Sequence, residues 1–291
     1  MKKTVLFTTT VLCSLLSFAQ NPTIDSTKNK VDTIKVGNFI IVKKHKDGAT
    51  HEVEKTGDKA FTVTVGSSKR NIKKNVSTNW WIVDLGFTNV RENTNYAAAA
   101  TAGYFKTLPN GTAVNQNSFS LNNGKSSNVN IWLFMQKVNI AKHKLNLKYG
   151  LGLEMYNFRY DTRLSYRKDP QPFVFNDSIG FSKNKLYAGY ATVPLMLNFQ
   201  ANPAKRKSFS ASIGVSAGYL ISSRNKQISN ERGKDKIKGN LNLDPWRFAT
   251  IAELGLGPVR LYGSYSFNAL HKSSTGLDQT PYAVGVRFSN W

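Results

Sequence analysis

The histidines of the chain limit the catalytic chemistry that it could perform. The four of them are His45, His51, His143 and His271. His271 has a serine, Ser273, two residues further on, and such a pair could supply the base and the nucleophile of a hydrolase. A hydrolase of this kind also needs a carboxylate that orients the imidazole, and only Asp278 is near in the sequence. We therefore expect His271 to be a solvated loop residue, and the hydrolase is kept as an alternative.

The spacing of ligand residues indicates no metal or cofactor site. The histidines are scattered along the chain and are not accompanied by spaced carboxylates. The one cysteine, Cys13, lies within the first twenty residues, so the chain after it can form neither a disulfide nor a thiolate site. We expect a protein that is not an enzyme and that uses no metal and no cofactor.

The first twenty residues, MKKTVLFTTTVLCSLLSFAQ, have the pattern of a secretory signal peptide. Lys2 and Lys3 precede an apolar run that is too short to span a bilayer, and Ser17-Phe18-Ala19 forms a small-x-small cleavage site. The pattern predicts a signal peptide over residues 1–19 and an exported protein.

The charge balance is strongly basic, with 40 Lys and Arg residues against 17 Asp and Glu residues and a net charge of +23. This excess favours a polyanionic neighbour. For an exported protein we expect lipopolysaccharide, another acidic glycan or lipid phosphate, and a generally basic surface without a specific partner is the alternative. Because no RNP, zinc-finger or helix-turn-helix pattern is visible, we expect no nucleic-acid partner.

From Asn79 to the C-terminus, large apolar residues alternate with small or polar ones in eight segments. The segments are residues 79–87, 128–138, 144–156, 186–199, 209–219, 247–256, 259–267 and 281–291. Strict alternation predicts strands with one apolar face, and a tilted strand crosses a bilayer with about 9 to 11 residues. Short links follow the second, fourth and sixth segments, whereas long polar loops follow the first, third, fifth and seventh. This order of links is typical of an up-and-down barrel in an outer membrane.

The face opposite the large apolar residues indicates which side of the sheet meets lipid. It carries Gly, Ser, Asn and Ala, interrupted by six ionisable residues, which are Asp84, Lys148, Glu154, Glu253, Arg260 and Arg287. Small residues with paired charges suit the inside of a narrow barrel, and large aliphatic and aromatic residues suit lipid. We therefore predict an all-β fold, an up-and-down antiparallel transmembrane β-barrel of about eight strands. A soluble β-sandwich or lipocalin-like barrel, with the faces reversed, is the alternative.

The predicted interior is too full for an open channel. Its tyrosines are Tyr156, Tyr190 and Tyr262. Eight strands leave room only for side chains, so these rings and the charges should fill the barrel. An unpaired buried ion costs several kcal/mol, so we expect Glu154 and Glu253 to be neutralised in a structural network. Their expected partners are among Lys148, Arg260 and Arg287, and a narrow passive pore for small solutes is the alternative.

Two further features concern a strand and a loop. Pro194 lies inside the fourth segment, and its missing N–H is tolerated only at a bulge or a weakly paired position, so we predict a strand kink rather than a gate.

The loop over residues 222–238 concentrates positive charge. Outside the cell it would lie next to phosphate-rich glycolipid, and a solvated, mobile loop is the alternative.

Residues 20–78 differ in composition from the rest of the chain, because they are polar and rich in lysine. Two short runs in this zone, residues 35–44 and 61–65, resemble strands. We predict a periplasmic N-terminal arm that could contain a short β-hairpin, followed by the barrel over residues 79–291.

Several stretches together resemble the PorT-like outer-membrane β-barrel family. They are the signal peptide, the strand YATVPLMLNF, the passage GVSAGYLISSRNKQ, the strand LKYGLGLE and a last strand that closes the chain. The resemblance covers residues 79–291 and implies an eight-stranded barrel in the outer membrane of a Gram-negative cell envelope. It also implies insertion by the barrel-assembly machinery, which recognises a terminal strand that ends in an aromatic residue. Phe288 and Trp291 would form this assembly signal, although Phe is the usual last residue.

The resemblance also bears on function. PorT itself is linked to type IX secretion and gliding, which implies type IX secretion or other envelope proteins as partners, but family membership alone does not carry that role to this chain. We expect a non-catalytic outer-membrane protein with a structural, binding or secretion-accessory role. After the narrow pore, the second alternative is an outer-membrane lipid A hydrolase that uses His271 and Ser273, similar to PagL-like deacylases.

Overall fold

The computed structural model describes residues 32–36, 39–43, 74–109, 111–204 and 208–289. The chain divides into two units, residues 1–71 and 72–291, and each is described by itself. In the first unit, β1 (Asp32–Val36) and β2 (Phe39–Lys43) pair as antiparallel strands. The predicted signal peptide, the run at residues 61–65 and Trp291 lie outside the described residues.

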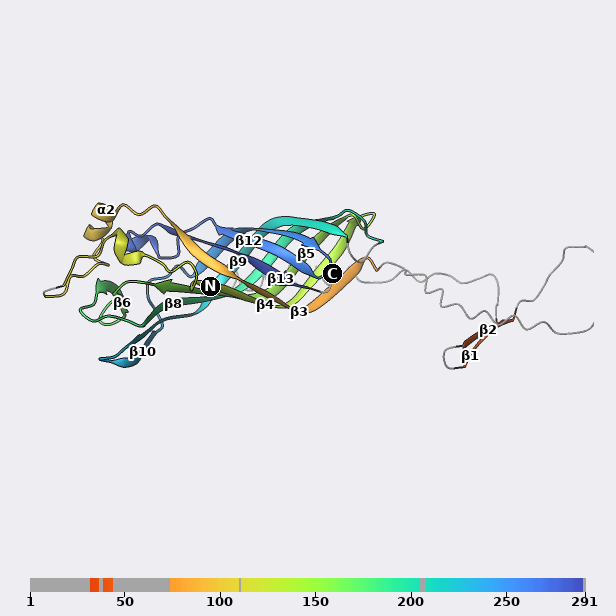
Figure 1. Cartoon of the computed structure of the whole chain (residues 1–291). Helices are drawn as coiled ribbons and strands as arrows, with labels where there is room; N and C mark the ends of the chain where they lie inside the picture. Colours follow the sequence, from red (N-terminus) through yellow and green to blue (C-terminus); the bar gives the residue numbers. More distant parts are fainter. Residues whose placement is uncertain (1–31, 37–38, 44–73, 110, 205–207, 290–291) are drawn as a thin grey trace, which may run out of the picture. The chain divides into compact units, whose positions relative to one another are not determined.

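The second unit is a closed barrel of eight antiparallel strands. They are β3 (Val76–Glu92), β4 (Ser127–Ala141), β5 (Leu145–Tyr160), β8 (Lys183–Gln200), β9 (Phe209–Ser229), β11 (Trp246–Leu256), β12 (Val259–Ser266) and β13 (Gln279–Phe288). Each strand pairs with the next, and β13 returns to pair with β3, which closes the sheet (Figure 1). The predicted up-and-down barrel is confirmed. Its first strand begins at Val76, slightly before the predicted Asn79.

Short turns join the strands at one end of the barrel, the turn end, and long loops join them at the other, the loop end. The turns are residues 142–144, 201–208 and 257–258, and the loops are residues 93–126, 161–182, 230–245 and 267–278. The loops contain elements that we did not predict: α2 (Tyr96–Thr101), η1 (Gln116–Phe119), β6 (Leu164–Arg167), β7 (Phe173–Asn176), β10 (Gly233–Lys238) and η2 (Ser273–Thr275). In Figure 1, α2, β6 and β10 lie beyond the barrel wall at the loop end. None of the helices in the described residues is long and apolar enough to cross a membrane.

The outer face of the barrel is apolar and is bounded by aromatic side chains. Exposed aromatics near the turn end are Trp80, Trp81, Phe199, Phe209 and Phe288, and those toward the loop end include Tyr219, Trp246, Phe248, Phe267 and Tyr282. From Phe209 to Tyr219 the strand β9 rises by roughly 25 Å along the barrel axis, given about 3.3 Å per residue and a tilt near 40°. This height matches the apolar band of an outer-membrane barrel.

Strict alternation does not hold through the second segment. Continued from Val129 and Ile131, it would place Met135 on the outer face, but Met135 is 0% exposed and lies inside the barrel. The pairing of β4 with β5 shifts by one residue between Trp132 and Phe134, and this bulge inverts the alternation that follows. A second irregularity lies in β3, where Trp81 has a φ of 57° and has no partner in β4. Trp80 and Trp81 therefore both face outward.

Pro194 lies in β8, where pairing with β5 is interrupted. The register runs from Tyr149 opposite Leu195 to Gly152 opposite Thr192, and the two positions between them, including Pro194, are not paired. The missing N–H of Pro194 thus falls in a gap of the ladder, which is the kind of position that tolerates proline within a sheet. On its other side Pro194 keeps its place opposite Ser216 of β9.

Glycines make room for the largest side chains inside the barrel. Gly285 of β13 and Gly86 of β3 are directly opposite each other, and the ring of Tyr262 lies against both. A Cβ atom at Gly285 would lie 2.3 Å from the carbonyl oxygen of Leu85 and 2.8 Å from the Tyr262 ring. Gly152 likewise faces the ring of Trp132, where a Cβ atom would approach to 2.6 Å.

The glycine beneath Tyr262 yields a test of interior packing. We expect G285A to lose roughly 1–3 kcal/mol of unfolding free energy, because overpacking forces the backbone or the ring to move. The matched control is G263A, since a Cβ atom at Gly263 has its nearest contact at 3.9 Å. Urea unfolding in detergent micelles, followed by heat-dependent gel migration, measures both variants. Equal stability of G285A and G263A would contradict this packing.

Candidate functional site

The six predicted interior ionisable residues all lie inside the barrel. They come from β3 (Asp84), β5 (Lys148 and Glu154), β11 (Glu253), β12 (Arg260) and β13 (Arg287). Each is at most 5% exposed to solvent. Alternation places them inside, and the closure of the sheet brings together residues that are distant in the sequence.

Arg287 lies at the centre of the network. Its Nε and Nη2 donate to the two carboxylate oxygens of Asp84, both at 2.7 Å. The register of β13 and β3 places these two residues directly opposite each other. Nη1 of Arg287 also pairs with Oε1 of Glu253 on β11. One arginine therefore neutralises carboxylates from two other strands. Asp84 is held further by Trp132, whose Nε1 donates to Oδ2 at 2.8 Å.

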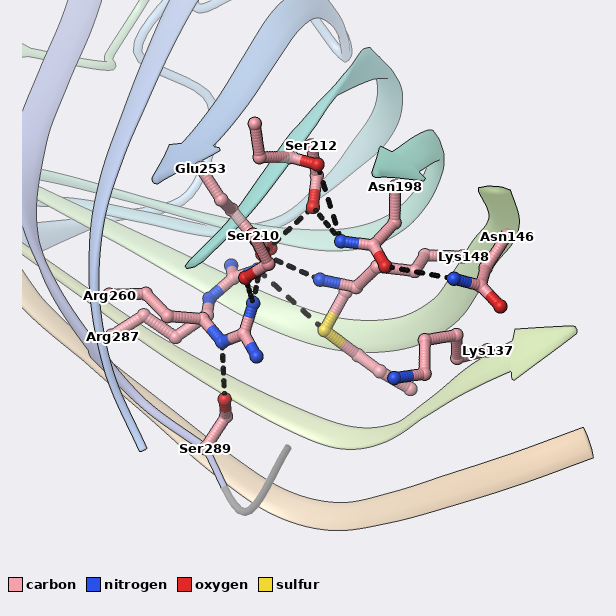
Figure 2. Close-up of polar contacts among 12 residues, drawn as sticks. Lys137, Asn146, Lys148, Asn198, Ser210, Ser212, Glu253, Arg260, Arg287 and Ser289 are labelled. Atoms are coloured by element: carbon pink, nitrogen blue, oxygen red, sulfur yellow. Dashed lines mark hydrogen bonds and ion pairs between the residues drawn. The ribbon is translucent and has the colours of Figure 1, made fainter. Parts of the chain in front are cut away.

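Glu253 has two more cations beside it (Figure 2). Nζ of Lys148 donates to Oε2 of Glu253 at 2.5 Å, and Nη1 of Arg260 lies 3.9 Å from the same oxygen. Arg260 donates to the hydroxyls of Ser210 and Ser289 at 2.8 and 2.9 Å. Because β5 and β11 are not neighbours in the sheet, the Lys148–Glu253 pair spans the barrel interior.

The expected partner of Glu154 was wrong. We expected Lys148, Arg260 or Arg287, but Glu154 pairs with Arg247 of β11, whose Nη1 lies 2.7 Å from Oε2. Arg247 also donates to Ser264 at 3.1 Å and lies over the ring of Tyr156, 4.7 Å from its centre. Arg247 was not among the six ionisable residues predicted for the interior, although it lies an even number of residues before Glu253 and so on the same face of β11.

The barrel interior is filled by these side chains. Three carboxylates, Asp84, Glu154 and Glu253, face four cations, Lys148, Arg247, Arg260 and Arg287, and every one of the seven is in a described ion pair. Three buried tyrosines, Tyr156, Tyr190 and Tyr262, lie on the same inner face. Ion pairs and rings thus occupy the lumen at the level of the membrane.

A cavity of about 620 Å³ opens at the turn end, below the network. Its lining includes Lys74, Lys137, His143, Asn146 and Gln200. Asn146 belongs to this lining, and its side-chain amide donates to Asn198 at 3.3 Å. Asn198 in turn donates to Ser212, which donates to Glu253, so a chain of hydrogen bonds leads from the cavity into the network (Figure 2).

At the loop end, the long loops pack into one ordered cap. Its buried apolar residues include Tyr104, Phe119, Leu164, Tyr166, Val174, Leu241, Leu243, Leu270 and Leu277. The hydroxyl of Tyr104 donates to the carbonyl of Leu241 at 2.8 Å, and the hydroxyls of Tyr160 and Tyr166 are 2.8 Å apart. A β-bridge joins Leu243 to His271. All four loops therefore share one core, which polar loop sequences did not lead us to expect.

His271 belongs to this core and is not a solvated loop residue. It is 1% exposed, its ring stacks on Tyr166 at 6.1 Å, and its Nε2 lies 3.4 Å from the Tyr166 hydroxyl. Burial lowers the pKa of His271 to about 3, so the imidazole is neutral at physiological pH. Nδ1 is buried without a hydrogen-bond partner, and Ser273 is exposed. The described contacts of His271 thus do not include the nucleophile and the orienting carboxylate of a hydrolase.

In the described part of the chain, no group of three or more His, Cys, Asp or Glu residues is placed to hold a metal ion.

The sequence matches the family described as "Outer membrane protein beta-barrel domain" over residues 83–275, which is more than half of the chain. The chain belongs to this family. The protein is therefore a barrel of the outer membrane.

The family places the two ends of the barrel. Outer-membrane barrels have short periplasmic turns and longer extracellular loops, so the turn end is periplasmic and the cap is extracellular.

Among solved structures, the chain is similar to Ail, the attachment invasion locus protein of Yersinia pestis, crystallised in complex with the heparin analogue sucrose octasulfate. The two share 11% identity over 73% of this chain and 97% of Ail, with a TM-score of 0.30. No curated protein matches the chain.

The Arg247–Glu154 pair yields a test of the interior network. We expect R247M to lose roughly 3–5 kcal/mol of unfolding free energy, because it leaves Glu154 charged and buried without its cation. The double variant E154Q/R247M should recover most of this loss, since it removes both charges. R91M, at an exposed arginine of β3, is the control and should change stability by no more than about 0.5 kcal/mol. A loss for R247M as small as that for R91M would contradict the network.

Proposed function

We propose that the protein is a non-catalytic and non-conducting barrel that presents an extracellular binding surface. The observation that carries this proposal is the filled lumen, in which all seven charges of the network are in ion pairs, some between neighbouring strands and some across the barrel. In such a molecule the membrane-spanning strands serve as an anchor. The parts that can meet a partner are the extracellular cap with its rim and the periplasmic opening.

The energetics of the ion pairs support a closed lumen. An open path would require Arg287 to leave Asp84 and Glu253, and each separated ion would lose its partner inside a narrow barrel. The effective penalty for an uncompensated buried ion is several kcal/mol. A closed barrel therefore explains the paired charges in the lumen better than a passive pore does.

The surroundings of His271 argue against catalysis. The imidazole contacts Tyr166 and lies against Tyr104 within the cap, and Ser273 is directed to solvent. A hydrolase would need a reorganised cap before these two residues could meet. We accordingly propose that the cap is a recognition surface, not an active site.

We further propose a PorT-like, secretion-accessory role within this family. The support is the resemblance of the strands around Pro194 and Lys148 and of the passage that begins at Gly214. Proposed partners are the barrel-assembly machinery, which would read Phe288 and Trp291, and type IX secretion or other envelope proteins. Phe288 is the last residue of β13 and is exposed on the lipid face.

The secretion-accessory role has its own test. In a strain that lacks the gene, type IX cargo should accumulate in the periplasm, and the wild-type gene should restore its surface display. Quantitative proteomics of the two fractions measures this. Unchanged cargo distribution would contradict the accessory role and leave the binding role in place.

The closed lumen predicts the electrical behaviour of the protein. In planar bilayers, the refolded full-length protein should show no stable channel events, because ion pairs and tyrosine rings fill the described part of the lumen. A sixteen-stranded porin, whose lumen is an aqueous channel, is the positive control. Reproducible single-channel conductance of the folded protein, identified by its heat-dependent gel migration, would contradict the proposal.

A further inference from the structure

The barrel wall above the membrane carries a patch of cations that we call the rim patch. Its members are Arg159 of β5, Lys183 and Lys185 of β8, Arg224 and Lys226 of β9, and Lys234, Lys236 and Lys238 of β10. Alternation places all eight on the outer face, because residues between them, such as Asn184 and Asn225, are buried inside. The strand β10 widens this face, since it pairs with the extracellular half of β9.

Within the rim patch, like charges are direct cross-strand partners. Lys185 lies opposite Lys226, which lies opposite Lys236 on its other side, and Arg159 lies opposite Lys185. Four adjacent strands therefore present one row of four cations. Arg224 and Lys238 form a second paired row. Like charges that face each other across strands are destabilising, so the arrangement needs a compensating anion.

The compensating anion does not come from the described part of the chain. None of the eight cations is in a described ion pair, and two acidic residues of the neighbouring loops pair with other cations: Asp235 with Arg167 at 3.9 Å and Asp177 with Arg232 at 2.6 Å. Lys185 donates only to the neutral side chain of Asn157, at 2.7 Å.

The rim patch lies just above the apolar band. On β9, Ile221 is 57% exposed and marks the upper edge of the band, and Arg224 follows three residues later. Given about 3.3 Å per residue and a tilt near 40°, Arg224 lies roughly 8 Å above Ile221. The headgroup layer of a bilayer begins at the hydrocarbon edge and is about 5–7 Å deep. Arg224 therefore lies at the outer edge of this layer, and the row through Lys226, two residues further along β9, lies roughly 13 Å above Ile221.

We propose that the rim patch is a binding site for the phosphate groups of a glycolipid in the outer leaflet, that is, of lipopolysaccharide. This inference rests on the outer-membrane location and not on the closed lumen. Anionic phosphates at this depth would separate the paired cations Lys185, Lys226 and Lys236 and neutralise them.

The direction of the patch favours a lipid over a soluble polyanion. Its cations project from the barrel wall on the same face as Tyr219 and Ile221 of β9, which meet lipid. A soluble polymer would have to enter the space between the wall and the surrounding headgroups. Tyr187 of β8 lies directly opposite Arg224, and the Arg224 guanidinium lies over its ring at 4.2 Å.

The test compares two triple variants of the refolded full-length protein. K185Q/K226Q/K236Q removes three of the four cations of the row, and K106Q/K125Q/K272Q removes the same charge from the cap, where these lysines form no described ion pair. Each protein is titrated with fluorescent lipopolysaccharide and with the same lipopolysaccharide after chemical removal of its phosphates. Heat-dependent gel migration establishes that each variant is folded.

We expect the rim variant to bind lipopolysaccharide on the order of a hundredfold more weakly than the wild type, since each cation near an anionic surface contributes about fivefold. The cap variant should bind like the wild type, and removal of phosphates should abolish the difference. Binding of the rim variant at wild-type strength, or equal binding of dephosphorylated lipopolysaccharide to the wild type, would overturn the proposal. The proposal would also be overturned if the rim variant lost binding only to a soluble polyanion such as dextran sulfate.

Stability provides a second readout that does not depend on affinity. In detergent without lipopolysaccharide, the rim variant should unfold at a urea concentration equal to or above that of the wild type, because the repulsion between paired lysines is gone. Added lipopolysaccharide should raise the midpoint of the wild type and leave that of the rim variant unchanged. A lower midpoint of the rim variant in detergent alone would show that the row is a structural element and would overturn the proposal.

Discussion

The structure depends on one arginine that holds two carboxylates inside a narrow barrel. Arg287 pairs with Asp84 across the β13–β3 seam and with Glu253 of β11, and the seam is the place where the last strand meets the first. A buried ion without a partner is costly, so the charges are tolerable only when the sheet is closed in this register. The network thereby ties barrel closure to the correct pairing of strands from both ends of the chain.

Space is the second constraint. Eight strands enclose a volume that side chains must fill, and here Trp132 and Tyr262 lie in room provided by opposing glycines. Above them, the four loops close the extracellular end with a shared core around Tyr166 and His271. We propose that the barrel is thereby an anchor for this outer surface. Its basic rim faces sideways, on the same face of the wall as Tyr219 and Ile221.

Much of the fold could be predicted, because alternation reports directly on which face of a strand meets lipid. The segment from Leu145 to Tyr156 shows this, since the exposure of its residues alternates as predicted. The exception, Met135, follows a bulge at Leu133, and a bulge leaves no residue type that marks it. Interior positions could be predicted, but the pair Arg247–Glu154 could not, since contacts across the lumen depend on the stagger of the closed sheet. The cap core was missed because its apolar residues are spread over four loops without periodicity.

The measurement that most directly tests the account is the orientation of one strand in a lipid bilayer. Replacing Cys13 leaves a cysteine-free chain, in which single cysteines at Ala211, Ile213 and Val215 can be compared with cysteines at Ser210, Ser212 and Ser216 of β9. Each cysteine carries an environment-sensitive fluorophore, and a quencher is dissolved in the lipid. The account predicts strong quenching at the odd-numbered positions and little at the even-numbered ones. Quenching at the even-numbered positions instead, or at neither set, would contradict a barrel with its apolar face toward lipid.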